Sequence, residues 1–203
     1  MASPLWLLLV GLSYVLLFGG LSLLRREGLS VQFAVEAVIF TLVVAGLSAL
    51  TGAAVSPILF LLLLYLLTMR VRLLVDLGNL LARRGNFAPA ASVYRLAARL
   101  WPDDAARLLV QINQGVLDLQ TGRLDEAVAA FKAVLAEAKG GYLGVKHECA
   151  SHYNLAVAYQ RQGQDAQAVL EFNAVLETWP ASEYARYAAI ALERRQKGMT
   201  SNE

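Results

Sequence analysis

Apolar residues dominate the first third of the chain and form three runs separated by short turns. The runs extend over 5–24, 31–50 and 53–69. A helix rises about 1.5 Å per residue, so about 20 residues cross a hydrocarbon core about 30 Å thick. The third run is shorter, but Pro57 can begin a helix and the apolar pattern continues beyond Arg70. We therefore expect three transmembrane helices, the last of which continues into the rest of the chain.

The few charges of this segment predict its orientation. Arg25 and Arg26 follow the first run, Arg70 and Arg72 follow the third, and the turn between the second and third runs is uncharged. Lys and Arg near membrane ends mark the cytoplasmic side. We therefore expect the N-terminus outside and everything after the third run in the cytoplasm, at a bacterial plasma membrane. A cleaved signal peptide is a weak alternative, because no basic residue precedes the first run.

Glu36 is the one acid within an apolar run, and an intramembrane carboxylate is a candidate functional residue. It lies near the cytoplasmic end of the second helix, where it can reach the headgroups or pair with Arg25 or Arg26. We expect Glu36 to make a polar contact within the membrane segment. A transport pathway near Glu36 is the functional alternative.

After Arg70 the pattern changes to amphipathic helices with closely spaced alanines, and three segments repeat one another. Each has a small residue, then a glycine seven positions later, an alanine five further on and an aromatic nine after the glycine. The three sets are Gly78, Gly85, Ala90 and Tyr94; Gly115, Gly122, Ala127 and Phe131; and Ala156, Gly163, Ala168 and Phe172. The glycine suits a turn between two helices, and the other positions suit close helix contacts.

This pattern resembles the tetratricopeptide repeat, a helix-turn-helix unit of about 34 residues. The resemblance implies an all-α fold, in which three transmembrane helices precede an α-solenoid with a C-terminal capping helix. The expected boundaries are 1–69 for the transmembrane domain, 70–198 for the repeat domain, 71–104, 108–141 and 149–182 for the repeats, 183–197 for the cap and 199–203 for a disordered tail. The glycines lie further apart than one repeat length, so extra residues are expected around 101–107 and 140–147.

The second copy departs most from the family. It has polar Gln111, Gln114 and Asp118 where the family has apolar or aromatic residues, and it lacks a closing proline. The third copy matches best, with His152 in place of the family's first aromatic residue and Pro180 at its end. We interpret all three as repeats.

In this family the concave face, lined by the first helix of each pair, holds a peptide or a partner helix. The positions that correspond to this groove are Val75, Asn79, Ile112, Asn113, Val116, Tyr153, Asn154 and Val157. An asparagine amide can both donate to and accept from a peptide backbone. A subclass that clamps the carboxylate tails of chaperones needs cations, but Val75, Ala150 and Asn154 stand in their places, so such a tail is not expected.

Composition narrows the functional classes further. The chain is 57% hydrophobic with a net charge of +2, and no basic run favours nucleic-acid binding. His147, Cys149 and His152 lie close together but lack a fourth metal ligand, so neither a metal nor another cofactor is expected. No phosphate loop or nucleophile with its base is present, which argues against an enzyme.

Two functional interpretations follow from these patterns. The first is a membrane-anchored scaffold or adaptor that recruits protein partners or assembles a membrane complex. The second is a permanent accessory subunit whose apolar helices pack against other membrane subunits. A transport component is a third, less favoured alternative. In each case the expected partners are proteins and the lipid bilayer.

Overall fold

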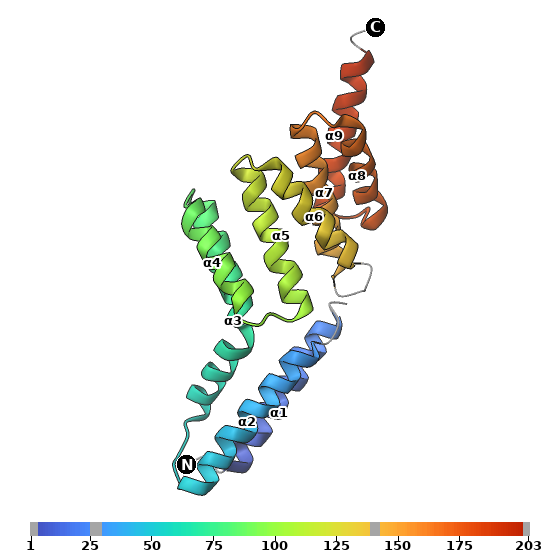
Figure 1. Ribbon diagram of the computed structural model, residues 1–203. Coiled ribbons are helices and arrows are strands. Elements are labelled where there is room, and N and C mark those ends of the chain that lie inside the picture. Colours follow the sequence, from blue (N-terminus) through green and yellow to red (C-terminus); the bar gives the residue numbers. More distant parts are fainter. Residues whose placement is uncertain (1–3, 25–29, 139–142, 201–203) are drawn as a thin grey trace.

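The computed structural model describes residues 4–24, 30–138 and 143–200, with the backbone alone at 22–24, 138 and 196–200. All regular structure in this part of the chain is helical. The helices are α1 (Pro4–Leu24), α2 (Val31–Thr51), α3 (Pro57–Arg83), α4 (Phe87–Arg99), α5 (Asp104–Gln120), α6 (Leu124–Ala138), α7 (Val145–Arg161), α8 (Asp165–Thr178) and α9 (Glu183–Thr200). Figure 1 shows α1 and α2 as a hairpin at one end, with α3 rising from it into the repeats and α9 at the opposite end.

The first three helices are long and apolar enough to cross a membrane. Their side chains face outward as well as inward: Leu50 is 87% exposed and Ile58 81% exposed. An apolar surface of this extent is unfavourable in water and favourable in lipid. Inside the bundle, Tyr14 of α1 shares a hydrogen bond of 2.6 Å with Thr68 of α3.

The third helix begins later than the sequence pattern predicts. Gly52 takes a left-handed conformation with φ 69° and ends α2, and α3 starts at Pro57 and not at residue 53. Proline is favoured in the first turn, because its missing N–H is not needed there. The helix then continues without interruption to Arg83, so the apolar segment and the first repeat share one helix, as predicted.

The repeats form three helix pairs: the second part of α3 with α4, α5 with α6, and α7 with α8. The turn glycines Gly85, Gly122 and Gly163 all have positive φ, which a side chain would oppose. The predicted alanines and aromatics are all buried: Ala90, Tyr94, Ala127, Phe131, Ala168 and Phe172. The repeat pattern therefore describes the packing of all three pairs.

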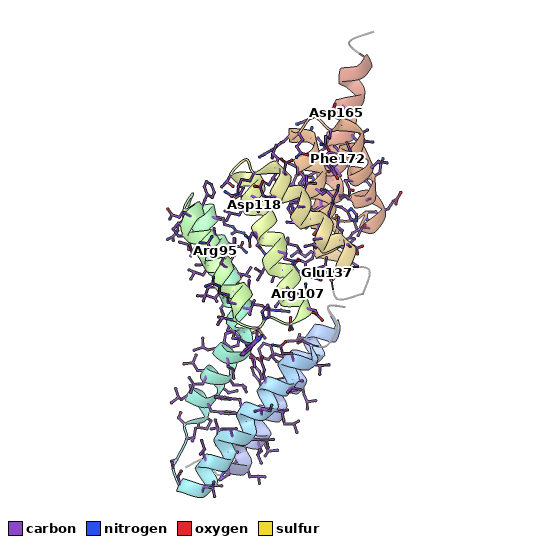
Figure 2. The ribbon with its side chains drawn as sticks, in the orientation of Figure 1. Arg95, Arg107, Asp118, Glu137, Asp165 and Phe172 are labelled. Carbon is purple, nitrogen blue, oxygen red and sulfur yellow. The ribbon has the colours of Figure 1, made fainter. Side chains whose placement is uncertain are left out.

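Polar contacts replace part of the apolar packing in the second repeat (Figure 2). The buried carboxylate of Asp118 accepts a hydrogen bond of 3.0 Å from Arg123 Nε in the turn that follows α5. At the other end of this pair, Arg107 of α5 lies 2.7 Å from a carboxylate oxygen of Glu137 on α6. Figure 2 shows Asp118 and the Arg107–Glu137 pair at opposite ends of this helix pair, so an ion pair lies at each end.

The extra residues between repeats lengthen the first helices of the pairs. α5 begins at Asp104 and α7 at Val145, both earlier than the predicted starts at 108 and 149. Asp103 caps α5, because its Oδ1 accepts from the Ala106 N–H at 2.7 Å. Residues 139–142, which include part of the predicted second insertion, lie outside the described residues.

The last helix is longer than predicted. Ser182 caps it, with its Oγ accepting from the Ala185 N–H at 3.0 Å. The helix continues to Thr200, so residues 199 and 200 are helical and not part of a disordered tail. Glycine in a helix costs only about 1 kcal/mol relative to alanine, so Gly198 does not end a helix that is already formed.

Candidate functional site

The first helices of the repeats lie side by side. α5 contacts both α3 and α7, and α7 contacts α9. Together α3, α5 and α7 carry all eight residues assigned to a partner-binding groove by the family resemblance. The structure therefore brings these positions onto neighbouring helices, although their side chains lie in different environments.

Two of the apolar groove positions are buried beneath the surface. Val75 is 1% exposed and Ile112 is 5% exposed, and each belongs to a hydrophobic core of the array. Val116 and Val157 are half-buried and pack against the same core as Ile112. Val75 and Ile112 therefore belong to the core of the helix array and are not exposed to a partner.

The three asparagines make contacts inside the array. Asn79 accepts a hydrogen bond of 2.7 Å from the hydroxyl of Tyr94, which joins α3 to α4. Asn113 and Asn154 each donate from Nδ2 to a carbonyl one turn earlier in their own helix, at 2.7 and 2.8 Å. In Asn113 and Asn154 the side-chain oxygen is therefore the group that can accept a hydrogen bond from a partner.

An open cleft of about 730 Å³ lies beside the last of the predicted groove positions. The predicted groove residues Tyr153 and Val157 form part of its wall. The remaining lining residues come from the end of α7 and from α8 and α9, and are Gln160, Asp165, Phe172, Tyr187, Ile190, Ala191, Arg194 and Arg195. The sequence does not predict the α9 residues as part of a site, because the pattern of 183–197 is typical of a capping helix.

Aromatic rings organise one wall of this cleft. The ring of Tyr153 lies 5.9 Å from that of Phe172, 5.5 Å from that of Tyr184 and 6.2 Å from that of Tyr187, measured between centroids. Burial raises the pKa of the Tyr153 hydroxyl, with a smaller contribution from Tyr187. The phenol is therefore neutral at physiological pH and can donate a hydrogen bond.

An ion pair links α8 and α9 at the cleft. Arg195 lies 2.8 Å from Asp165, and its hydrogen bond lowers the pKa of that carboxyl group. Aromatic faces beside arginines suit a partner segment that combines apolar or aromatic side chains with carboxylates.

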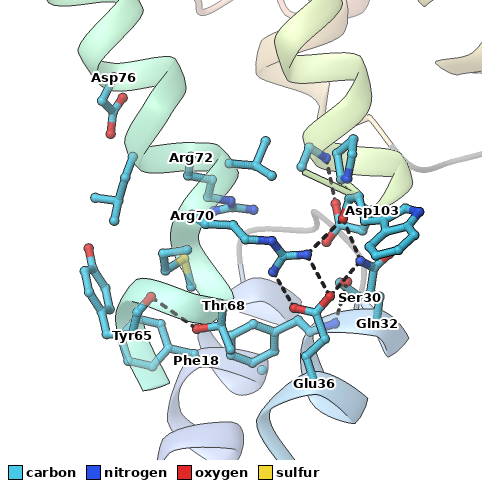
Figure 3. A pocket seen from close by; sticks show the side chains of 18 of the residues that line it. Phe18, Ser30, Gln32, Glu36, Tyr65, Thr68, Arg70, Arg72, Asp76 and Asp103 are labelled. Carbon is cyan, nitrogen blue, oxygen red and sulfur yellow. Dashed lines mark hydrogen bonds and ion pairs between the residues drawn. The ribbon is translucent and has the colours of Figure 1, made fainter. Parts of the chain in front are cut away.

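The second candidate site lies where the apolar helices meet the repeats (Figure 3). Glu36 of α2 forms a bidentate ion pair with Arg70 of α3, in which Arg70 Nη2 donates to Glu36 Oε1 at 2.8 Å. Gln32 also donates to Glu36 Oε1, at 2.8 Å. Arg25 and Arg26, the partners expected from the sequence, lie outside the described residues. The carboxylate thus joins two of the apolar helices.

The guanidinium of Arg70 also holds the loop between α4 and α5. Its Nε donates to the Leu100 carbonyl and its Nη2 to the Trp101 carbonyl, both at 3.0 Å. A further bond of 2.7 Å runs from Nη1 to the carbonyl of Leu67. With the two bonds to Glu36, all five N–H donors of Arg70 are used. A pocket of about 280 Å³ adjoins this network between α1, α2, α3 and the loop.

The His and Cys residues of α7 serve the packing of the third repeat. His152 Nδ1 lies 2.6 Å from a carboxylate oxygen of Glu171 on α8. Cys149 is fully buried, with its Sγ 3.3 Å from Ser182 Oγ. Among the residues that the structure describes, no three His, Cys, Asp or Glu side chains are grouped in a way that could hold a metal ion.

Residues 150–182 match the family model described as tetratricopeptide repeat. Residues 150–182 thus form a tetratricopeptide repeat. The matched residues comprise most of α7, all of α8 and the turn that leads to α9. Searches of curated proteins and of solved structures found no match. Tetratricopeptide repeats form helical scaffolds for protein–protein interaction, and the family is typically non-catalytic.

Proposed function

We propose that this tetratricopeptide-repeat protein is a membrane-anchored adaptor. In this proposal α1, α2 and the first part of α3 cross the bilayer, with the N-terminus outside. The repeats lie at the cytoplasmic face of a plasma membrane, as in a bacterium, and hold a partner protein there. Two features support the orientation: the basic residues that follow the apolar part of α3, and the uncharged connection from α2 to α3 at the far end of the hairpin.

The observation that carries the proposal is the Arg70 network. Because α3 is continuous, the first repeat has no linker to the apolar helices. Arg70 then ties α2 and the α4–α5 loop to that same helix. A bidentate guanidinium–carboxylate pair restricts orientation as well as distance. The repeats are therefore held at a defined position close to the lipid surface, which suits the presentation of a bound partner to a membrane complex.

The cleft that contains Tyr153 and Val157 is the proposed place for a peptide or helix of the partner. It is the part of the groove that combines accessible apolar wall residues with polar groups. Ile190 lines this cleft and is 40% exposed, whereas Leu170 of α8 is 67% exposed and does not line it. These two positions provide a matched pair of apolar-to-acidic substitutions.

The partner test uses the full-length protein, crosslinked in cells and purified in mild detergent. We expect Ile190→Asp to lose the partners that Leu170→Asp retains, because a carboxylate in the cleft opposes apolar burial. Equal capture by both variants would contradict binding in the cleft. Stoichiometric partners that survive extensive washing would indicate a permanent accessory subunit, and partners that exchange would indicate an adaptor.

The topology requires a separate test. A protease-sensitive tag at the C-terminus should be protected in intact cells and cleaved once the membrane is permeabilised. Cleavage of the tag from outside intact cells would refute the cytoplasmic placement of the repeats, whatever the result of the partner experiment.

A further inference from the structure

Trp101, in the loop between α4 and α5, combines exposure with an unusual backbone conformation. Its side chain is 86% exposed, and its φ is +47°. Within the described residues it is the sole non-glycine residue with positive φ. A bulky residue in this region is strained and persists only when its surroundings impose the conformation. A residue with these properties is a candidate for a function outside the folding of the array.

The surroundings that impose this conformation belong to the apolar helices. The Trp101 carbonyl accepts hydrogen bonds from Gln32 Nε2 at 2.7 Å and from Arg70 Nη2 at 3.0 Å. The preceding carbonyl, of Leu100, accepts from Arg70 Nε. On the other side of Trp101, Asp103 caps α5 and so fixes the end of the loop. Figure 3 shows the side chains of Gln32, Arg70 and Asp103 close to one another. The backbone is therefore pinned, while the indole is left uncovered.

Gln32 and Arg70, which bond to the Trp101 carbonyl, also define the depth of the indole relative to a membrane. Gln32 lies in the first turn of α2, and Arg70 is the first charged residue that follows the apolar part of α3. The loop is thus bonded to the two helices where they would leave the hydrocarbon. Tryptophan is enriched at that depth, because its ring is amphipathic and its N–H can bond to water or headgroups. The exposed Arg99, at the end of α4, adds a donor suited to phosphate groups.

We propose that Trp101 inserts into the headgroup layer of the leaflet that faces the repeats, so that the α4–α5 loop is a second membrane-binding element. This inference rests on the proposed insertion of α1–α3 in the bilayer. Its ligand is the lipid surface itself. Together with α3 and the Arg70 network, a loop bound to lipid holds the repeat array against the membrane at two points.

The test uses three full-length variants that each retain one tryptophan, with the other two replaced by phenylalanine. Trp6 is 60% exposed on α1 and reports on membrane insertion, whereas Trp179 is 40% exposed after α8 and serves as the control far from the membrane. Each variant is reconstituted in phosphatidylcholine vesicles, with or without bromine atoms on the upper part of the acyl chains. Bromine quenches tryptophan emission only at short range. Circular dichroism verifies that each variant retains its helices.

We expect brominated lipid to reduce the emission of Trp6 and Trp101 and to leave that of Trp179 unchanged. Quenching of Trp6 without quenching of Trp101 would overturn the lipid contact while leaving the membrane insertion intact; such a result would suit an indole that faces a protein partner. Absence of quenching at Trp6 would overturn both proposals. Equal quenching of Trp101 and Trp179 would also overturn the proposed lipid contact of Trp101. The difference in emission between the wild type and Trp101→Phe provides the same measurement without the other substitutions.

Discussion

Arg70→Ala tests whether one guanidinium holds the repeat array in place on the apolar helices. The substitution removes five hydrogen bonds, two of them to the carboxylate of Glu36 and two to the α4–α5 loop. It also leaves Glu36 without its ionic partner. The continuous helix α3 remains, so we expect the fold of the repeats to survive while their position becomes less restricted.

The size of the effect follows from the burial of the pair. Hydrogen bonds to charged groups contribute about 1.5–3 kcal/mol each when buried, and exposed ion pairs about 0.2–1 kcal/mol. The side chains of Arg70 and Glu36 are 21% and 26% exposed, which lies between these limits. We expect a loss of about 3 kcal/mol in docking free energy, which increases the undocked population about a hundredfold. Arg70→Lys keeps the charge but has fewer donors and no planar fork, so its effect should be smaller.

A pair of spin labels on full-length protein in vesicles measures how widely the distance between the apolar helices and the repeats varies. One label replaces the exposed Leu47 on α2 and the other replaces the exposed Ala129 on α6, with Cys149 changed to Ala. The distribution of distances between the two labels should be narrow in the labelled protein that retains Arg70, broad with Arg70→Ala and intermediate with Arg70→Lys. Arg95→Ala is the control, because within the described residues this exposed arginine bonds only to the Ser92 hydroxyl of its own helix. A distribution that stays narrow with Arg70→Ala would refute the reasoning.

Three further predictions concern the repeats. Gly78→Ala would place Cβ at 2.7 Å from Tyr94 Cδ1 and 2.9 Å from Cζ, so overpacking should lower the free energy of unfolding by about 1–3 kcal/mol; a midpoint equal to the wild type in chemical denaturation would contradict this. Tyr94→Phe should cost about 0.5–1.5 kcal/mol in the same assay, because it removes the hydrogen bond to Asn79. Burial raises the pKa of the Cys149 thiol, so a maleimide should label it only after unfolding; rapid labelling of the native protein at neutral pH would show that α7 is not packed as described.

Most of the helix arrangement could be predicted from local patterns. The glycines at 85, 122 and 163 predicted the turns, because positive φ is a property of single residues. The alanines and aromatics predicted the contacts within each pair, because those contacts repeat at fixed spacings. The start of α3 was placed too early, since an apolar pattern does not reveal where Gly52 ends the preceding helix.

The residues of the candidate sites could be predicted less well from local patterns. Val75 and Ile112 were assigned to the groove by correspondence with the family, but only packing shows that they belong to the core of the helix array. The α9 side of the cleft, with Tyr187 and Ile190, was missed because a capping helix was not expected to line a binding surface. The role of Arg70 was also missed, because its acceptors on the α4–α5 loop lie some thirty residues further along the chain.

By itself, the sequence determined that the chain has three apolar helices followed by helical repeats, because apolar run length and helical periodicity depend on residues close together in the chain. The sequence also predicted that one helix runs from the first half into the second, but the tertiary structure alone decided how the two halves are held relative to each other. It brought Glu36, Arg70 and the carbonyls of Leu100 and Trp101 into one network, although they belong to α2, α3 and the loop before α5. Such a network depends on the relative positions of helices, and those are set by packing over the whole molecule.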